Sequence, residues 1–287
     1  MLTSIRGIVA ASFATGLALS AAPAFAETSA PENEFDLAAV EAAADVTVDV
    51  ADLEAATPVV DYASVNRAGD ESSVEISGNV ALASEYRFRG IDLSGGDIAI
   101  QGGIDLTHSS GFYVGTWGSS LDEDTVGYGH TELDVYAGFS GELTEGVSFD
   151  IGALAYLYPN AGAGDYDYIE AYGSVGFSIG PAESTLGIAY APKQDSLGGT
   201  DNFYIYYDLS LGVPGTPFTA TGHVGYTDGF LTFTNDGKAF DWSIGVETPL
   251  YGPVSFGVAY VGAEDDILPG NYDFADDALV FTLSASI

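Results

Sequence analysis

The chain of 287 residues has no cysteine and few basic side chains. Without cysteine it has neither disulfides nor thiolate chemistry, which suits a protein that crosses an oxidising compartment. Lysine and arginine together number 6 against 42 acidic residues, giving a formal net charge of -36. Because so few basic residues cannot neutralise a phosphate backbone, the composition excludes nucleic acid as a partner.

The sequence also lacks an apolar run long enough for a membrane-spanning helix. The run from Ile8 to Leu19 is shorter than the roughly 20 residues that such a helix needs. It follows Arg6 and precedes the small-x-small sequence Ala24-Phe25-Ala26, and this order is typical of a secretory signal peptide. We therefore predict a signal peptide over residues 1–26 and export of the remainder.

The segment that follows the leader is strongly acidic. Residues 27–73 contain many carboxylates, one basic residue (Arg67) and almost no aromatic side chains. Such a segment cannot bury enough apolar surface to offset the conformational entropy lost on folding. We predict a disordered periplasmic arm over 27–73 and a folded domain over 74–287.

From Val74 onward, apolar and polar residues alternate. Leu133, Val135 and Ala137, for example, alternate with Glu132 and Asp134, so in a strand the two sets point to opposite faces. None of the eleven prolines lies in an alternating segment, as expected because proline cannot donate a ladder hydrogen bond. The predicted strands are 74–89, 98–108, 112–121, 130–140, 147–157, 168–179, 184–190, 203–212, 218–226, 240–247, 254–261 and 278–287.

Short and long connections between these strands alternate along the chain. Even-numbered connections have three to six residues, and odd-numbered ones have eight to sixteen. An even number of strands with tight turns at one end and longer loops at the other is typical of an outer-membrane barrel. The sequence therefore predicts an all-β fold, a single transmembrane antiparallel up-and-down β-barrel of about 12 strands.

The apolar face of the predicted strands carries aromatic residues at both rims and small aliphatic residues between them, the pattern of a lipid-facing surface. The rim aromatics are Phe112, Phe139, Phe149, Phe177, Phe218 and Phe256 near the short turns, and Tyr86, Phe88, Tyr190, Phe203, Tyr226, Phe240, Trp242 and Tyr260 near the long loops.

The opposite face carries eleven carboxylates, which a dry core could not hold, so we expect it to line a narrow aqueous lumen. These acidic residues are Glu75, Glu85, Asp105, Glu132, Asp134, Asp150, Glu170, Glu183, Asp208, Asp241 and Glu247.

One stretch resembles a known family. Residues 80–91 read Val-Ala-Leu-Ala-Ser-Glu-Tyr-Arg-Phe-Arg-Gly-Ile, followed by Gln-Gly-Gly-Ile-Asp at 101–105 and Gly-Phe-Tyr-Val-Gly-Thr-Trp-Gly-Ser at 111–119. This text resembles the TorF family of porin-like outer-membrane proteins, most closely over 78–121. The resemblance implies an outer-membrane location and a porin role, with no established substrate and no catalytic residues. Outer-membrane proteins usually have an aromatic final residue, and this sequence has Ile287 there instead.

The sharpest local feature is a pair of arginines beside an acidic residue. Arg87 and Arg89 fall on the same predicted lumen face as Glu85, near the long-loop end of the first predicted strand. On other strands we expect four acidic residues at a similar height. Opposed charges there would line a constriction that filters solutes by charge. Alternatively, the arginines form an ion-paired brace in the wall. The acidic residues are Glu132, Asp134, Glu170 and Asp241.

We predict a porin-like channel for passive diffusion of small hydrophilic solutes or ions, favouring cations because acidic lumen residues outnumber basic ones. Its surroundings would be outer-membrane lipid and lipopolysaccharide. One alternative is a non-conducting structural or adhesive barrel whose acidic loops bind divalent ions or envelope partners. A second is an outer-membrane hydrolase that uses His130, Glu132 and a serine such as Ser119. No nucleophile motif is present, and we expect no enzyme activity, cofactor or bound metal.

Overall fold

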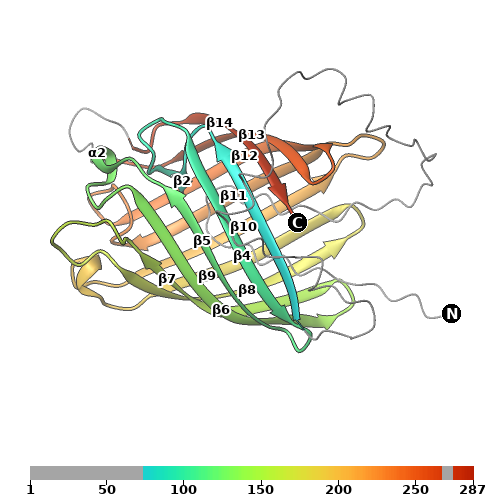
Figure 1. Ribbon diagram of the computed structural model, residues 1–287, viewed down its shortest axis with the longest axis horizontal. Helices are drawn as coiled ribbons and strands as arrows, with labels where there is room; N and C mark the ends of the chain where they lie inside the picture. The colour runs from blue at the N-terminus through green and yellow to red at the C-terminus, as the bar shows by residue number, and fades with distance from the viewer. Residues whose placement is uncertain (1–73, 267–273) are drawn as a thin grey trace, which may run out of the picture. The chain divides into compact units, whose positions relative to one another are not determined.

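The computed structural model describes residues 74–266 and 274–287, so the predicted signal peptide (1–26) and acidic arm (27–73) lie outside the described residues. The described chain forms a closed barrel of twelve antiparallel strands in sequence order, which confirms the predicted fold (Figure 1). The strands are β1 (Val74–Ala83), β4 (Ala99–His108), β5 (Phe112–Ser120), β6 (Thr131–Thr144), β7 (Val147–Leu157), β8 (Tyr168–Ile179), β9 (Ala182–Ala191), β10 (Asn202–Gly212), β11 (Thr219–Gly229), β12 (Lys238–Tyr251), β13 (Val254–Ala263) and β14 (Ala278–Ser286).

The barrel closes where the first and last strands meet. β1 pairs with β4 along its whole length and with β14 through residues 79–83. Beyond this ladder, the Gly78 N–H donates to the Ile287 carbonyl at 3.0 Å and the Ile287 N–H donates to the Gly78 carbonyl at 2.9 Å. Closure matters because an open sheet edge in hydrocarbon would leave backbone groups unpaired, at several kcal/mol each.

The outer surface of the barrel is apolar. Ile104, Ile151 and Ile244 are each more than half exposed, and the aliphatic band that they represent runs around the strands. Such a surface is unfavourable in water and suits acyl chains. In the described residues no helix is long and apolar enough to cross a membrane.

Two features at the strand ends differ from the sequence prediction. β12 extends to Tyr251 and so includes Pro249, where the register with β13 shifts. The irregularity lies next to a turn, where a missing ladder donor is tolerated. Two long loops also contain short helical turns, α2 (Glu123–Val126) and η3 (Asp195–Leu197), which the sequence analysis did not predict. α2 lies at the end of the barrel where the longer loops gather, on the left in Figure 1.

The largest difference is at the first predicted strand, 74–89. β1 ends at Ala83, and the chain then leaves the wall and forms a small separate hairpin. Its strands are β2 (Arg87–Phe88) and β3 (Ile91–Asp92). The side chains of Tyr86 and Phe88, predicted as part of the lipid-facing rim, are buried instead. We call residues 84–97 the lumen hairpin.

A candidate constriction inside the barrel

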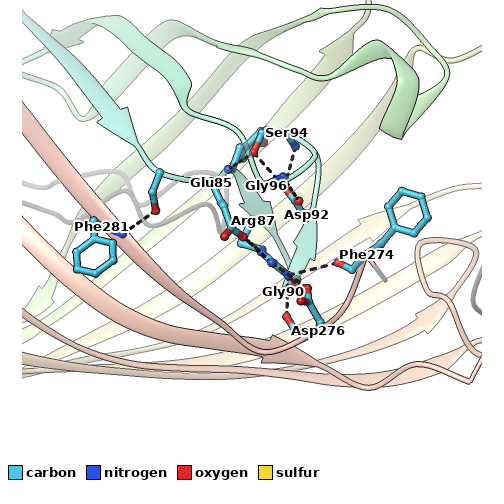
Figure 2. Close-up of polar contacts among 11 residues, drawn as sticks. Glu85, Arg87, Gly90, Asp92, Ser94, Gly96, Phe274, Asp276 and Phe281 are labelled. Carbon is cyan, nitrogen blue, oxygen red and sulfur yellow. Dashed lines mark hydrogen bonds and ion pairs between the residues drawn. The ribbon is translucent and has the colours of Figure 1, made fainter. Parts of the chain in front are cut away.

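The lumen hairpin lies in the interior of the barrel. It leaves the wall after β1, yet it contacts Glu132 on β6, Glu170 on β8 and Tyr204 on β10, which belong to distant parts of the wall. A segment can reach these strands together only through the lumen. Figure 2 shows the chain entering from β1, with Arg87 extended beside Gly90 and Asp276.

The hairpin reverses direction at Arg89 and Gly90, which both have positive φ, 49° and 78°. Two successive left-handed residues form the type I′ turn that suits a two-residue β-hairpin. For a residue with a side chain this conformation costs about 1–2 kcal/mol, so Arg89 is strained. At Gly90 a Cβ would lie 2.6 Å from the Gly262 carbonyl oxygen and 2.7 Å from the Ala263 Cβ, so the turn lies directly against β13.

Local hydrogen bonds hold the base of the hairpin. Asp92 accepts from the Ser94 N–H at 2.8 Å and from the Gly96 N–H at 2.7 Å, and Ser94 Oγ accepts from the Tyr86 N–H at 2.8 Å. An aspartate that bonds backbone groups two and four residues later favours a tight loop over a continued strand. These bonds explain why the segment does not extend β1.

Arg87 connects the hairpin to its own stem and to the last long loop. Its Nε donates to Glu85 Oε2 at 2.8 Å, and its Nη1 donates to the Asp276 carbonyl at 2.9 Å. Its Nη2 also lies 3.1 Å from the Asp276 carboxylate (Figure 2). Arg87 is therefore paired within the hairpin and loops, and not with the acidic residues predicted for the opposite wall.

Arg89 does reach the opposite wall. Its Nη2 donates to both oxygens of Glu170, at 2.9 and 2.8 Å, and both side chains are buried. The guanidinium carbon lies 4.2 Å from the centre of the Tyr204 ring and 4.8 Å from that of Phe88, within cation–π range. Burial alone lowers the pKa of Arg89, but Glu170 and the surrounding tyrosines together outweigh it and raise the pKa, so the guanidinium stays charged.

The remaining predicted site residues lie around this ion pair. The Tyr86 hydroxyl donates to Glu132 Oε1 at 2.6 Å, which connects Glu132 to the hairpin. Asp241 accepts a hydrogen bond at 3.1 Å from the hydroxyl of Tyr204, the same tyrosine whose ring Arg89 contacts. Asp134 is buried, and its Oδ1 has no hydrogen-bond partner in the described part of the chain.

The structure therefore brings Arg89 and Glu170 into direct contact, and joins Glu132 and Asp241 to them through tyrosines. Glu85 and Arg87 form a separate pair. The four wall carboxylates were expected to face water, but all four are buried. Glu132, Glu170 and Asp241 accept hydrogen bonds from phenol or guanidinium donors, which is how a buried carboxylate is stabilised when solvent is excluded.

The tyrosines around this ion pair were not predicted from the sequence. Tyr156 donates to Glu170 Oε2 at 3.1 Å, and Tyr204 links Arg89 to Asp241. A signal was present, because lumen glycines lie against several tyrosine rings of the inner face. At Gly225, for example, a Cβ would lie 2.6 Å from a Tyr204 ring carbon, so glycine provides the space that the ring fills.

His223, on β11, is a further polar group of the inner face. Its Nδ1 lies 2.5 Å from Asp208 Oδ1 and its Nε2 lies 2.8 Å from Asp241 Oδ1. An ionised carboxylate only accepts hydrogen bonds, so both ring nitrogens donate and the ring carries a positive charge. His223 thus lies between two acidic residues of neighbouring strands.

The predicted grouping of His130, Glu132 and Ser119 does not form. His130 is exposed and bonds the hydroxyl of its neighbour Thr131 at 2.9 Å, whereas Glu132 points inward to Tyr86. Ser119 Oγ donates to the carbonyl of Ser120 at 3.0 Å. Across 74–266 and 274–287, no cluster of three or more His, Cys, Asp or Glu residues is arranged to hold a metal ion.

The closed barrel and its apolar exterior make this chain an outer-membrane β-barrel protein. Its sequence matches, over residues 67–287, the family described as "Bacterial protein of unknown function (Gcw_chp)", and the chain belongs to that family. The name TorF therefore stays a prediction. Among curated proteins, none matches this sequence.

The solved structure of one porin, NanC, shares the fold. The NanC porin aligns with a TM-score of 0.51 and 9% sequence identity, covering 74% of this chain and 98% of that one. The outer-membrane protein OpdK from Pseudomonas aeruginosa aligns with a TM-score of 0.41 and 11% identity, covering 76% of this chain and 67% of that one. At these identities the likeness to NanC is one of fold.

Proposed function

We propose that the protein is a narrow, porin-like channel of the outer membrane that passes small hydrophilic solutes and favours cations. The observation that carries this proposal is the charge balance of the inner face. Both lumen arginines are already ion-paired with carboxylates, Arg87 with Glu85 and Arg89 with Glu170. The other acidic residues of the inner face therefore leave a surplus of negative charge.

The surplus extends into the short-turn half of the lumen, away from the hairpin. Asp105 and Asp150 there accept hydrogen bonds from tyrosine hydroxyls, at 2.5 Å from Tyr136 and 2.6 Å from Tyr113. These phenols fix the carboxylates in position without cancelling their charge. Because charges in a confined space interact more strongly than in bulk water, the sign of the wall sets the sign of the preferred ion.

Reversal potentials in planar bilayers under a KCl gradient test this proposal. We expect K⁺ to be more permeant than Cl⁻, and Asp105→Asn to reduce the ratio. Asp124→Asn, in the exposed turn α2, removes the same charge outside the lumen and should leave the ratio unchanged. Anion selectivity of the wild-type protein would contradict the proposed preference.

One observation favours a second function, that of a non-conducting structural barrel. The lumen hairpin fills part of the interior, where Tyr86, Leu93 and wall tyrosines form a buried cluster. In this case the acidic long loops would contact lipopolysaccharide through divalent ions. The two functions separate when the wild type is compared with a variant in which residues 86–95 are replaced by a short Gly-Ser linker. Current steps only in the variant would support the structural barrel.

A further inference from the structure

The surroundings of Arg89 have the features of a binding site for a guanidinium group. One carboxylate, that of Glu170, receives two hydrogen bonds from the same nitrogen, and an aromatic ring covers the face of the group at 4.2 Å. A carboxylate at the edge of the guanidinium and a ring on its face together recognise organic cations. Here the cation is part of the chain, and it lies at the tip of a hairpin.

The hydrogen bonds of this site are incomplete. Arg89 Nε and Nη1 are buried and have no hydrogen-bond partner in the described part of the chain, and neither has Asp134 Oδ1. The exposed fraction of Arg89 is 5% and that of Asp134 is 2%, so neither is solvated by bulk water. Buried polar atoms of this kind are normally paired with protein, water or a ligand.

The wall places Asp134 on the same side as Glu170. In the strand register Asp134 of β6 lies opposite Tyr156 of β7, and Tyr156 lies opposite Tyr168 of β8. Tyr168 is two residues before Glu170, so both point to the same face of the sheet. Tyr156 also donates to Glu170. Beside the carboxylate that binds Arg89, the wall therefore holds a second buried carboxyl group, whose Oδ1 Arg89 does not use.

We propose that Glu170, Tyr204 and Asp134 form a binding site for a small organic cation with a guanidinium or primary ammonium group, and that Arg89 occupies it as a tethered competitor. An organic cation is favoured over a metal ion because the carboxylates of this region do not converge as a set of metal ligands. As a step in transport this inference rests on the proposed channel function, whereas binding itself does not require conduction.

Displacement of Arg89 has a defined structural consequence. Arg89 is strained at φ 49°, and its ion pair with Glu170 joins the hairpin tip to β8. A solute cation that takes over Glu170 and Tyr204 releases that connection and lets residue 89 relax. Arg87, paired with Glu85 and Asp276, keeps the base of the hairpin attached. The hairpin tip then moves while its stem stays in place.

The test measures binding of methylguanidinium to the full-length exported protein in detergent micelles by calorimetry. We expect Arg89→Ala to bind it at least about tenfold more tightly than the wild type, since the competitor is gone. Lys238→Ala removes a positive charge from the exposed start of β12, outside the hairpin, and should bind like the wild type. Adding Glu170→Gln to Arg89→Ala should weaken binding by roughly tenfold or more, because a charge-assisted hydrogen bond is lost.

Methylurea, a neutral molecule of the same shape, should not bind to any variant. Heat-dependent gel mobility shows whether each barrel is folded, and Arg89→Gln, which keeps the length of the side chain, replaces Arg89→Ala if that variant does not fold. Equal affinity of the Arg89 and Lys238 variants would overturn the proposal, and so would binding that is unaffected by Glu170→Gln.

Conductance measurements on the same preparations separate this inference from the channel function. Binding without single-channel current would support the proposed cation site and refute the proposed transport role. Current without binding would retain the channel and remove the site. In a Trp242→Phe background, fluorescence of Trp117 reports on the hairpin, because its ring lies 5.6 Å from that of Tyr86. Methylguanidinium should change this signal, and methylurea should not.

Discussion

Substitution of Gly90 by alanine should release the lumen hairpin from the wall. Alanine at φ 78° costs about 1–2 kcal/mol. Its Cβ would also overlap the Gly262 carbonyl oxygen and the Ala263 Cβ, at 2.6 and 2.7 Å, and such overpacking costs about 1–3 kcal/mol. The sum of about 2–5 kcal/mol corresponds to a rise of roughly 30-fold to a few thousand-fold in the population with a detached hairpin, at about 1.4 kcal/mol per factor of ten.

Single-channel recording in planar bilayers measures this change as a higher open probability or a larger conductance. Gly215→Ala is the matched control: its φ is 77°, but no atom lies within 4 Å of the added Cβ. It lies in a short turn remote from the hairpin and should leave the current unchanged. If Gly90→Ala and Gly215→Ala gave the same current as the wild type while both barrels remained folded, the hairpin would not limit conduction and the reasoning would fail.

Three further changes test other contacts. Tyr86→Phe removes the 2.6 Å bond to the buried Glu132 and should lower the free energy of unfolding by about 1–3 kcal/mol, measured by urea titration in lipid vesicles. Leu186→Arg, on the outer face of β9, should destabilise the membrane-inserted barrel by about 2–4 kcal/mol. Thr185→Arg, on the inner face, should change the stability little, and equal effects of the two substitutions would refute the lipid-facing assignment. His223→Asn removes a positive charge from the lumen and should raise the K⁺/Cl⁻ permeability ratio, measured as a shifted reversal potential.

The barrel was predictable because lipid and lumen impose a period of two on each strand. β7 and β8 begin and end at the residues predicted from alternation alone, 147–157 and 168–179. Other strand ends differ by a few residues, as at β12, where Pro249 was expected to stop the strand. Proline is a reliable boundary only where the ladder needs an N–H donor at that position, and next to the turn it does not.

The lumen hairpin was not predictable from alternation, because its sequence continues the pattern of β1. Tyr86 and Phe88 alternate with Glu85, Arg87 and Arg89 as they would in a spanning strand. An aromatic side chain that faces acyl chains and one that packs inside a plugged lumen look the same in sequence, since both are buried from water. The turn could be recognised only once the backbone showed two successive residues with positive φ.

The contacts among the candidate-site residues were predicted only in part, for a similar reason. Alternation assigns a residue to a face, so Glu132, Glu170 and Asp241 were correctly expected to point inward. It does not say which side chain meets which, because that depends on register and on the path of the hairpin. Arg89 was expected in the wall of the first strand, and its contact with Glu170 arises only because the chain crosses the lumen.

The two arginine pairs differ in what they connect, and this bears on whether Arg89 braces the barrel or restricts its lumen. Arg87 pairs with Glu85 within the hairpin itself, so its ion pair stiffens the stem. Arg89 pairs with Glu170 on β8, with both partners buried. A buried ion pair adds little net stability over apolar packing, because removing both charges from water offsets their attraction. Since Arg89 also has a strained backbone, its pair with Glu170 is better explained by position than by stability, because it fixes the hairpin tip against one strand of the wall. That is the arrangement which the proposed constriction and the proposed cation site both require.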